Sequence, residues 1–105
     1  MSDNISGYTR ITTSTLINEG STLLYGVSVQ SVVSGIAALD FDGTVVIYEG
    51  QDATTGRVLM TLEVEPDGSL YNSFDNPVRL ERGLYVSLGT HVTDVTLFWV
   101  PGGVR

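Results

Sequence analysis

Apolar and polar residues alternate in short stretches along most of the chain, and this pattern limits the fold more than any other feature. In residues 58–64 every second side chain is apolar, while Thr61 and Glu63 are expected on the opposite face. The residues expected on the apolar faces of this stretch and of stretch 23–30 are Val58, Met60, Leu62 and Val64, and Leu23, Tyr25, Val27 and Val29. A period of two is the period of side chains along a β-strand, so half-buried antiparallel strands are predicted.

Turn-forming pairs such as Asp42-Gly43, Thr55-Gly56 and Asn76-Pro77 separate the alternating stretches. About eight strands are expected in this way, at residues 8–17, 22–33, 36–40, 44–49, 57–65, 77–81, 84–88 and 93–100. Their even spacing predicts an all-β chain, a single-domain antiparallel β-sandwich of jelly-roll or Greek-key type over residues 8–105. The polar residues 1–7 are expected to form a flexible N-terminal arm. The pattern does not determine the order of the strands.

Two runs, residues 45–48 and 95–100, are apolar on both faces of the expected strands. Such strands are expected either in the middle of a sheet or beneath another subunit. The two runs therefore favour self-assembly over ligand binding.

The charges of the chain exclude several classes of protein. The sequence has 105 residues, a formal net charge of -7 and no cysteine, and all of its five basic residues are arginines. No basic stripe is present to neutralise a phosphate backbone, so we expect no nucleic-acid partner. Without thiolates the chain cannot form disulfides or a cysteine zinc site. No apolar run has the length of a membrane span, and no cofactor is expected.

The side chains needed for catalysis are sparse. His91 is the single histidine, which excludes a site built on several histidines, and its place beside Gly89 and Thr90 predicts an exposed turn. No Gly-x-Ser-x-Gly nucleophile motif and no glycine-rich phosphate loop occur. We therefore expect that the chain is not an enzyme.

Carboxylates gather at two places, and both places have the sequence of a turn. Asp40 and Asp42 precede Gly43 without the spacing of a calcium loop, and Asp42-Gly43 is typical of a hairpin turn. Glu63, Glu65 and Asp67 surround a Pro-Asp-Gly turn at the end of a strand. A small hydrolase that uses Asp40, Asp42 or Glu63 is the weakest of the functional hypotheses.

Aromatic side chains favour a second class of function, because they can form a sugar-stacking platform on one face of a sandwich. The aromatic residues that could form this platform are Tyr8, Tyr25, Tyr48, Tyr71, Phe74, Tyr85 and Trp99. Of these, Tyr48, Tyr71, Tyr85 and Trp99 are the candidates for stacking in a carbohydrate-binding or receptor-binding module. Trp99 lies in an apolar run and is expected in the core. Tyr48 and Tyr85 are out of phase with the apolar residues of their strands and are expected to point outward.

Three segments between residues 44 and 100 share a pattern of strands and glycine turns. They are Val45-Val46-Ile47-Tyr48-Glu49-Gly50 followed by Ala53-Thr54-Thr55-Gly56-Arg57-Val58-Leu59, then Gly83-Leu84-Tyr85-Val86, then Gly89-Thr90 before Asp94-Val95-Thr96-Leu97-Phe98. Together they resemble the small all-β virion structural proteins of tailed bacteriophages. The resemblance implies a capsid decoration or cement protein that binds the outer capsid surface as a homo-oligomer, with a trimer favoured. It also implies a major capsid protein or another virion protein as partner, and synthesis in the host cytoplasm.

An acidic domain is poorly suited to line packaged DNA, which favours a place on the outside of the virion. Interfaces are enriched in tyrosine, tryptophan and arginine. The candidate partner contacts are Tyr8, Arg10, Tyr48, Tyr71, Arg79 and Tyr85. The alternative is a carbohydrate-binding or receptor-binding module of a phage tail or tail fibre.

Overall fold

The computed structural model describes residues 7–31, 43–65, 68–89 and 92–102, and these residues form strands and turns without a helix. The eight strands are β1 (Tyr8–Ile11), β2 (Thr15–Asn18), β3 (Thr22–Ser31), β4 (Gly43–Glu49), β5 (Arg57–Val64), β6 (Ser69–Leu80), β7 (Leu84–Leu88) and β8 (Val92–Pro101). The prediction of an all-β chain is confirmed.

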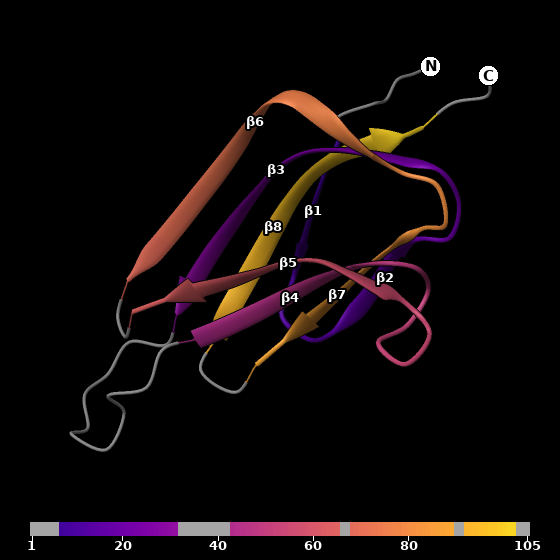
Figure 1. Ribbon diagram of the computed structural model, residues 1–105. Helices are drawn as coiled ribbons and strands as arrows, with labels where there is room; N and C mark the ends of the chain where they lie inside the picture. Colours follow the sequence, from indigo (N-terminus) through magenta and orange to yellow (C-terminus); the bar gives the residue numbers. More distant parts are fainter. Residues whose placement is uncertain (1–6, 32–42, 66–67, 90–91, 103–105) are drawn as a thin grey trace.

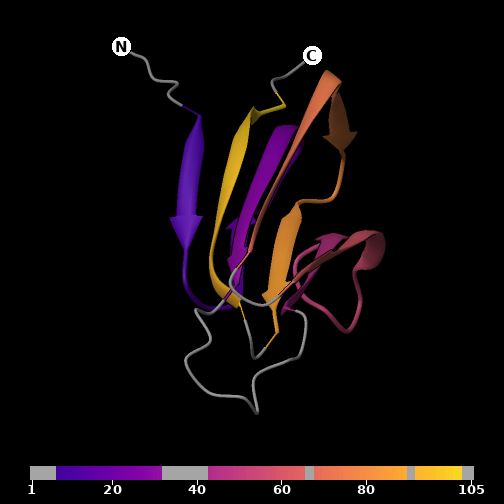
Figure 2. The ribbon, with the colours of Figure 1, turned by 90° about the vertical axis from the view of Figure 1, so that its left-hand side faces the viewer.

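The strands form two antiparallel sheets that pack face to face as a β-sandwich. The first sheet has the order β1-β8-β3-β6 and the second the order β2-β7-β4-β5. Figure 1 shows the sheets as separate layers, with β6, β3 and β8 side by side in one and β5, β4 and β7 in the other. Figure 2 shows β1, β8 and β3 following one another across the first sheet.

The pairing of the strands is nested along the chain. The pairs are β1 with β8, β2 with β7, β3 with β6 and β4 with β5, and β3–β8 and β4–β7 contacts complete the sheets. This nesting is the jelly-roll arrangement, in which a long hairpin is wound into two sheets. Of the two topologies that the sequence left open, the structure therefore has the jelly roll.

The core lies between the two sheets and consists of aliphatic side chains. The buried apolar residues are Ile11, Leu24, Val27, Val29, Val45, Ile47, Leu62, Val64, Leu80, Leu84, Val86, Val92, Val95 and Leu97. Trp99 packs against this core as expected, and its indole Nε1 donates a hydrogen bond to Thr9 Oγ1 at 3.0 Å. The two doubly apolar runs belong to β4 and β8, and both strands lie inside their sheets. That placement confirms the first of the two explanations given for these runs.

Three expectations about the strands are corrected. Residues 8–17 were expected as one strand, but they form β1 and β2, which belong to different sheets. A turn separates them, in which Thr15 Oγ1 donates to the carbonyl of Thr13 and Ser14 Oγ accepts a hydrogen bond from the amide of Leu88. The strand expected at 77–81 begins earlier, at Ser69, because Pro77 occupies an edge strand, where the loss of one amide donor is tolerated.

The third correction concerns two residues that were expected on buried faces. Tyr25 is 43% exposed and Val58 is 55% exposed. The register of β3 shifts between Leu24 and Gly26, and the β4–β5 register shifts between Ile47 and Tyr48. A bulge puts the side chains on one side of it out of phase with those on the other, so Tyr25 and Val58 face outward although Val27 and Val64 are buried as expected.

Two expectations lie outside the described residues. The strand expected at 36–40 falls there entirely, and so do residues 1–6 of the expected N-terminal arm. Gly7, the last residue of that arm, is described, and its carbonyl accepts a hydrogen bond from the amide of Trp99 at 2.7 Å.

Candidate functional site

The described residues show no cluster suited to metal binding. Among them no group of three or more histidine, cysteine, aspartate or glutamate side chains is placed to hold a metal ion. Glu63 is exposed on β5, where it lies opposite Thr44. His91, Asp40, Asp42 and Asp67 lie outside the described residues. In the part of the chain that is described, no helix is long and apolar enough to cross a membrane.

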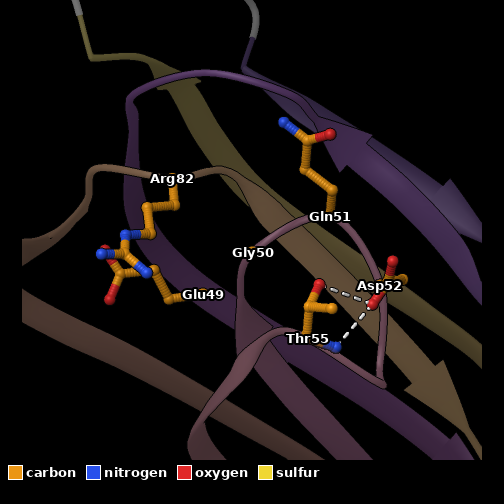
Figure 3. Close-up of a pocket in the computed structure, with 6 residues that line it drawn as sticks. All are labelled: Glu49, Gly50, Gln51, Asp52, Thr55 and Arg82. Carbon is orange, nitrogen blue, oxygen red and sulfur yellow. Dashed lines mark hydrogen bonds between the residues drawn. The ribbon is translucent and has the colours of Figure 1, made fainter.

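A polar depression of about 300 Å³ lies at the end of the sandwich where β4 leads into β5 (Figure 3). Its lining includes Glu49, Gln51, Asp52 and Arg82. Asp52 Oδ1 accepts hydrogen bonds from the amide of Thr55 at 2.7 Å and from its hydroxyl at 2.9 Å. These bonds lower the pKa of the Asp52 carboxyl from its ordinary value, 3.8. The carboxylate therefore organises its own loop.

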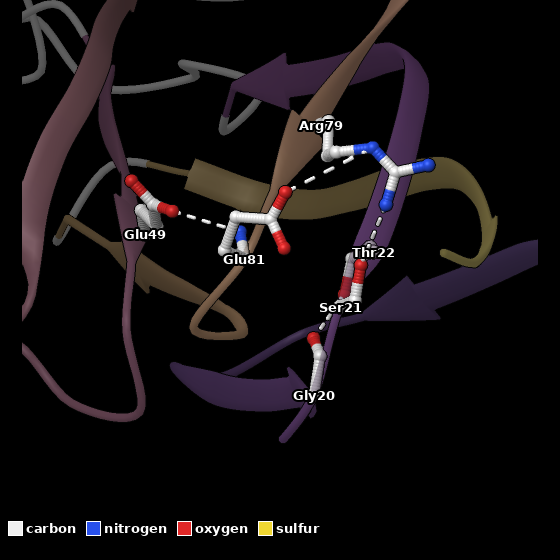
Figure 4. Close-up of polar contacts among 6 residues, drawn as sticks. All are labelled: Gly20, Ser21, Thr22, Glu49, Arg79 and Glu81. Carbon is white, nitrogen blue, oxygen red and sulfur yellow. Dashed lines mark hydrogen bonds and ion pairs between the residues drawn. The ribbon is translucent and has the colours of Figure 1, made fainter. Parts of the chain in front are cut away.

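Arg79 belongs to a polar network beside this depression (Figure 4). Its Nη1 donates to Ser21 Oγ at 3.1 Å, and its Nε lies 3.9 Å from a carboxylate oxygen of Glu81. The amide of Glu81 in turn donates to Glu49 Oε2 at 2.8 Å. Arg79 thus connects β6 to the turn before β3, and its side chain remains half exposed.

The outer side of the first sheet carries a group of aromatic side chains that we call the aromatic face. Its members are Tyr8 on β1, Phe98 on β8, Tyr25 on β3 and Tyr71 on β6. Tyr8 is 63% exposed and Tyr71 is 60% exposed. The ring of Phe98 is half-buried, with its centroid 6.4 Å from that of Tyr8 and 5.8 Å from that of Tyr71. The face therefore extends from one edge of the sheet to the other.

Gly26 allows Phe98 and Tyr71 to meet although β3 lies between their strands. Phe98 pairs with Gly26 in the β3–β8 register, and Ser73 pairs with Gly26 on the other side. A methyl group on Gly26 would lie 3.7 Å from the Phe98 ring and 2.9 Å from the carbonyl oxygen of Asn72. Because Gly26 has no side chain, the two rings contact each other above β3.

An ion pair adjoins the aromatic face. Arg10 Nη2 lies 2.9 Å from Asp94 Oδ2, and this contact joins β1 to β8. The Arg10 side chain is 59% exposed, while that of Asp94 is only 11% exposed. The pair thus places a guanidinium at the surface without adding net charge to this face.

The outer side of the second sheet carries a line of four side chains that we call the apolar row. The row runs across all four strands and consists of Leu16 on β2, Tyr85 on β7, Tyr48 on β4 and Val58 on β5. The ring centroids of Tyr48 and Tyr85 are 6.0 Å apart. Three of the residues are half-buried, and Val58 at the edge is exposed.

The six candidate contacts divide between three places. Tyr8, Arg10 and Tyr71 come together on the first sheet, Tyr48 and Tyr85 on the second, and Arg79 lies in the polar network. Tyr48 and Tyr85 point outward as expected, because they alternate with the buried Ile47 and Val86.

Sequence reasoning placed Tyr25 and Val58 on buried faces, and it did not single out Phe98 or Leu16. Bulges reversed the orientation of the first two. The sequence does contain a signal for Phe98. It follows Leu97, and if Leu97 faces the core, alternation along the strand predicts that Phe98 faces outward.

Comparisons of the chain with protein-family models, with curated proteins and with solved structures gave no match.

Proposed function

We propose that the protein is a bacteriophage virion structural protein of the capsid decoration or cement type. In this proposal identical subunits, with a trimer favoured, bind the outer surface of the head shell and contact the major capsid protein. The observation that carries it is the apolar row, which crosses all four strands of one outer sheet face. The proposal assigns no reaction to the chain.

The apolar row has the composition of the central part of a protein interface. Two tyrosines in contact lie at its middle, with Leu16 and Val58 at its ends. Tyrosine is enriched among residues that dominate binding energy, and half-buried rings lose little conformational freedom when a partner covers them. A flat sheet face also allows a second sheet or a shell surface to pack across several strands at once.

The resemblance and the topology add support by analogy. Tyr48 and Tyr85 belong to two of the segments that resemble phage virion proteins. The jelly roll is a fold of viral capsid domains and also of lectins. The fold is therefore compatible with a virion role, but it does not by itself distinguish that role from sugar binding. The net charge of -7 favours a site on the outside of the shell, away from packaged DNA.

The test combines sedimentation velocity with binding to undecorated head shells of the phage whose genome encodes the chain. We expect the wild-type protein to sediment as a homo-oligomer and to pellet with the shells. Val58→Arg places a charge in the apolar row at an exposed position, so the fold should persist. It should weaken shell binding at least tenfold, about 1.4 kcal/mol.

Tyr71→Arg is the matched control, because Tyr71 is equally exposed but lies on the opposite sheet. This variant should bind shells like the wild type. A wild-type chain that stays monomeric at high concentration and never pellets with shells would show the proposal to be wrong. Equal binding by Val58→Arg would show that the apolar row is not the contact surface.

A further inference from the structure

The aromatic face is separate from the apolar row, since the two lie on the outer sides of different sheets. The proposed function does not use it. Three of its four rings are among the most exposed large apolar side chains of the described residues. Exposed aromatic rings gathered in one place mark a surface that binds something.

Hydroxyl-bearing side chains are interspersed among these rings. Ser28 and Thr96 alternate with buried core residues, so they point to the same side of the sheet as the rings. Ser73 pairs with Gly26 beneath the rings, and the Arg10–Asp94 pair adjoins them. The surface therefore offers aromatic ring faces and hydrogen-bonding groups in alternation, within one layer.

We propose that the aromatic face binds a neutral oligosaccharide made of pyranose units. One side of a pyranose ring presents C–H groups that pack on an aromatic ring, while its hydroxyls bind polar groups at the rim. Tyr8 and Tyr71 supply the stacking surfaces, and Arg10 supplies a donor for sugar hydroxyls. Tyr8 and Tyr71 lie on the two edge strands, with the Phe98 ring between them at centroid distances of 6.4 Å and 5.8 Å, so the two stacking rings can contact different units of one oligosaccharide.

The charges favour a neutral glycan over an acidic one. Arg10 is neutralised by Asp94, so this face has no unpaired cation to attract a carboxylate or sulfate. The chain as a whole carries a net charge of -7 and repels anionic polymers. An uncharged sugar needs no unpaired cation and is not repelled by the negative charge of the chain.

The arrangement of the rings favours a glycan over a second copy of the chain. The Tyr71 ring stands at 87° to that of Phe98, and the Tyr8 ring is tilted by 48°, so the surface is uneven. The central part of a protein interface is depleted of charged groups, whereas here an ion pair and hydroxyls lie among the rings. A protein partner would have to bury these polar groups, while a sugar can bond to them.

The test is calorimetric titration of the full chain with cello-, malto-, xylo-, manno- and chito-hexaose, with polygalacturonate oligomers as the anionic comparison. We expect at least one neutral hexaose to bind more tightly than about 1 mM, and the anionic oligomers to bind more weakly. Tyr71→Ser and Tyr8→Ser should each weaken that binding at least fivefold. Tyr71→Trp should retain it, because the stacking surface remains.

Tyr48→Ser is the control, since it removes a tyrosine from the other sheet, and thermal unfolding checks that every variant is folded. A silent panel, or unchanged binding in Tyr71→Ser and Tyr8→Ser, overturns the inference. Self-association that Tyr71→Ser abolishes would overturn it too, because a second copy would then occupy the face. Shell binding is tested separately, with Val58→Arg. A negative result in the sugar titration therefore does not contradict the proposed function.

Discussion

Gly83 lies at the end of the sandwich where three connections between strands meet. Its φ is +118°, a conformation that residues with a side chain rarely adopt. Its carbonyl accepts a hydrogen bond from the amide of Gly50, which also has a positive φ of +148°. The turn before β7 is therefore held against the β4–β5 loop by two glycines. Both glycines lie in ordinary turn sequences, so the sequence did not show that their φ angles are positive.

Replacement of Gly83 by alanine should destabilise the fold strongly. A methyl group there would lie 2.8 Å from the carbonyl oxygen of Asn18 and 3.0 Å from that of Gly50. We expect Gly83→Ala to lower the free energy of unfolding by roughly 2–3 kcal/mol, since strain at a positive φ adds to these contacts. Urea unfolding followed by Trp99 fluorescence measures the change.

Gly20→Ala is the control for this prediction. A methyl group on Gly20 would meet no heavy atom within 4 Å. Its effect should stay within about 0.5 kcal/mol. Similar losses for both variants would contradict the role given to Gly83.

At the scale of single elements, two bulges explain why some side chains face solvent although strict alternation along the strand predicted that they face the core. The sequence placed Val58 and Val64 on the same buried face of one strand. The register shift beside Tyr48 leaves Val64 inside and turns Val58 outward to the end of the apolar row. A bulge is decided by the pairing with neighbouring strands, which the local sequence does not contain.

The two valines of β5 therefore provide a matched pair of substitutions. Val64 is 3% exposed and Val58 is 55% exposed. We expect Val64→Ala to lower the free energy of unfolding by roughly 2 kcal/mol, because it removes buried methyl groups and leaves a cavity. Val58→Ala should change it by less than about 0.5 kcal/mol. Equal losses in urea unfolding would mean that the alternation is unbroken and that β5 has no bulge.

The difference between local sequence pattern and pairing between strands explains how much of the fold and the site was predictable. The strands β4, β5, β7 and β8 were predicted to within a residue, because each combines clear alternation with glycine turns at its ends. The first two thirds of β6 were missed, since residues 69–76 are mostly polar and precede a proline. The two surfaces combine residues from strands that are distant in sequence, and no local pattern places Tyr8 beside Phe98.

At the scale of the whole molecule, the nested pairing makes nearly every sheet contact a long-range one. Among the described strands, only β4 and β5 are both consecutive and paired with each other. The pair β1–β8 joins Tyr8 to Phe98, at opposite ends of the chain. This is why the strand order could not be derived from the sequence, although the positions of most described strands could.

The nesting also predicts how the chain folds. The β4–β5 hairpin requires the smallest loop closure, whereas β1 can pair only after β8 has taken its place. We expect refolding on the millisecond-to-second scale that is typical of folds rich in long-range contacts. Val45→Ala in β4 should mainly slow folding, and Ile11→Ala in β1 should mainly speed unfolding.

Stopped-flow refolding and unfolding of these two variants measures the difference. Both residues are buried, so both substitutions should destabilise the fold enough for reliable φ-values. A φ-value for Ile11 that equals or exceeds that of Val45 would mean that the ends of the chain associate early. The central hairpin would then not be the nucleus, and the jelly roll would form from its outermost pair inward.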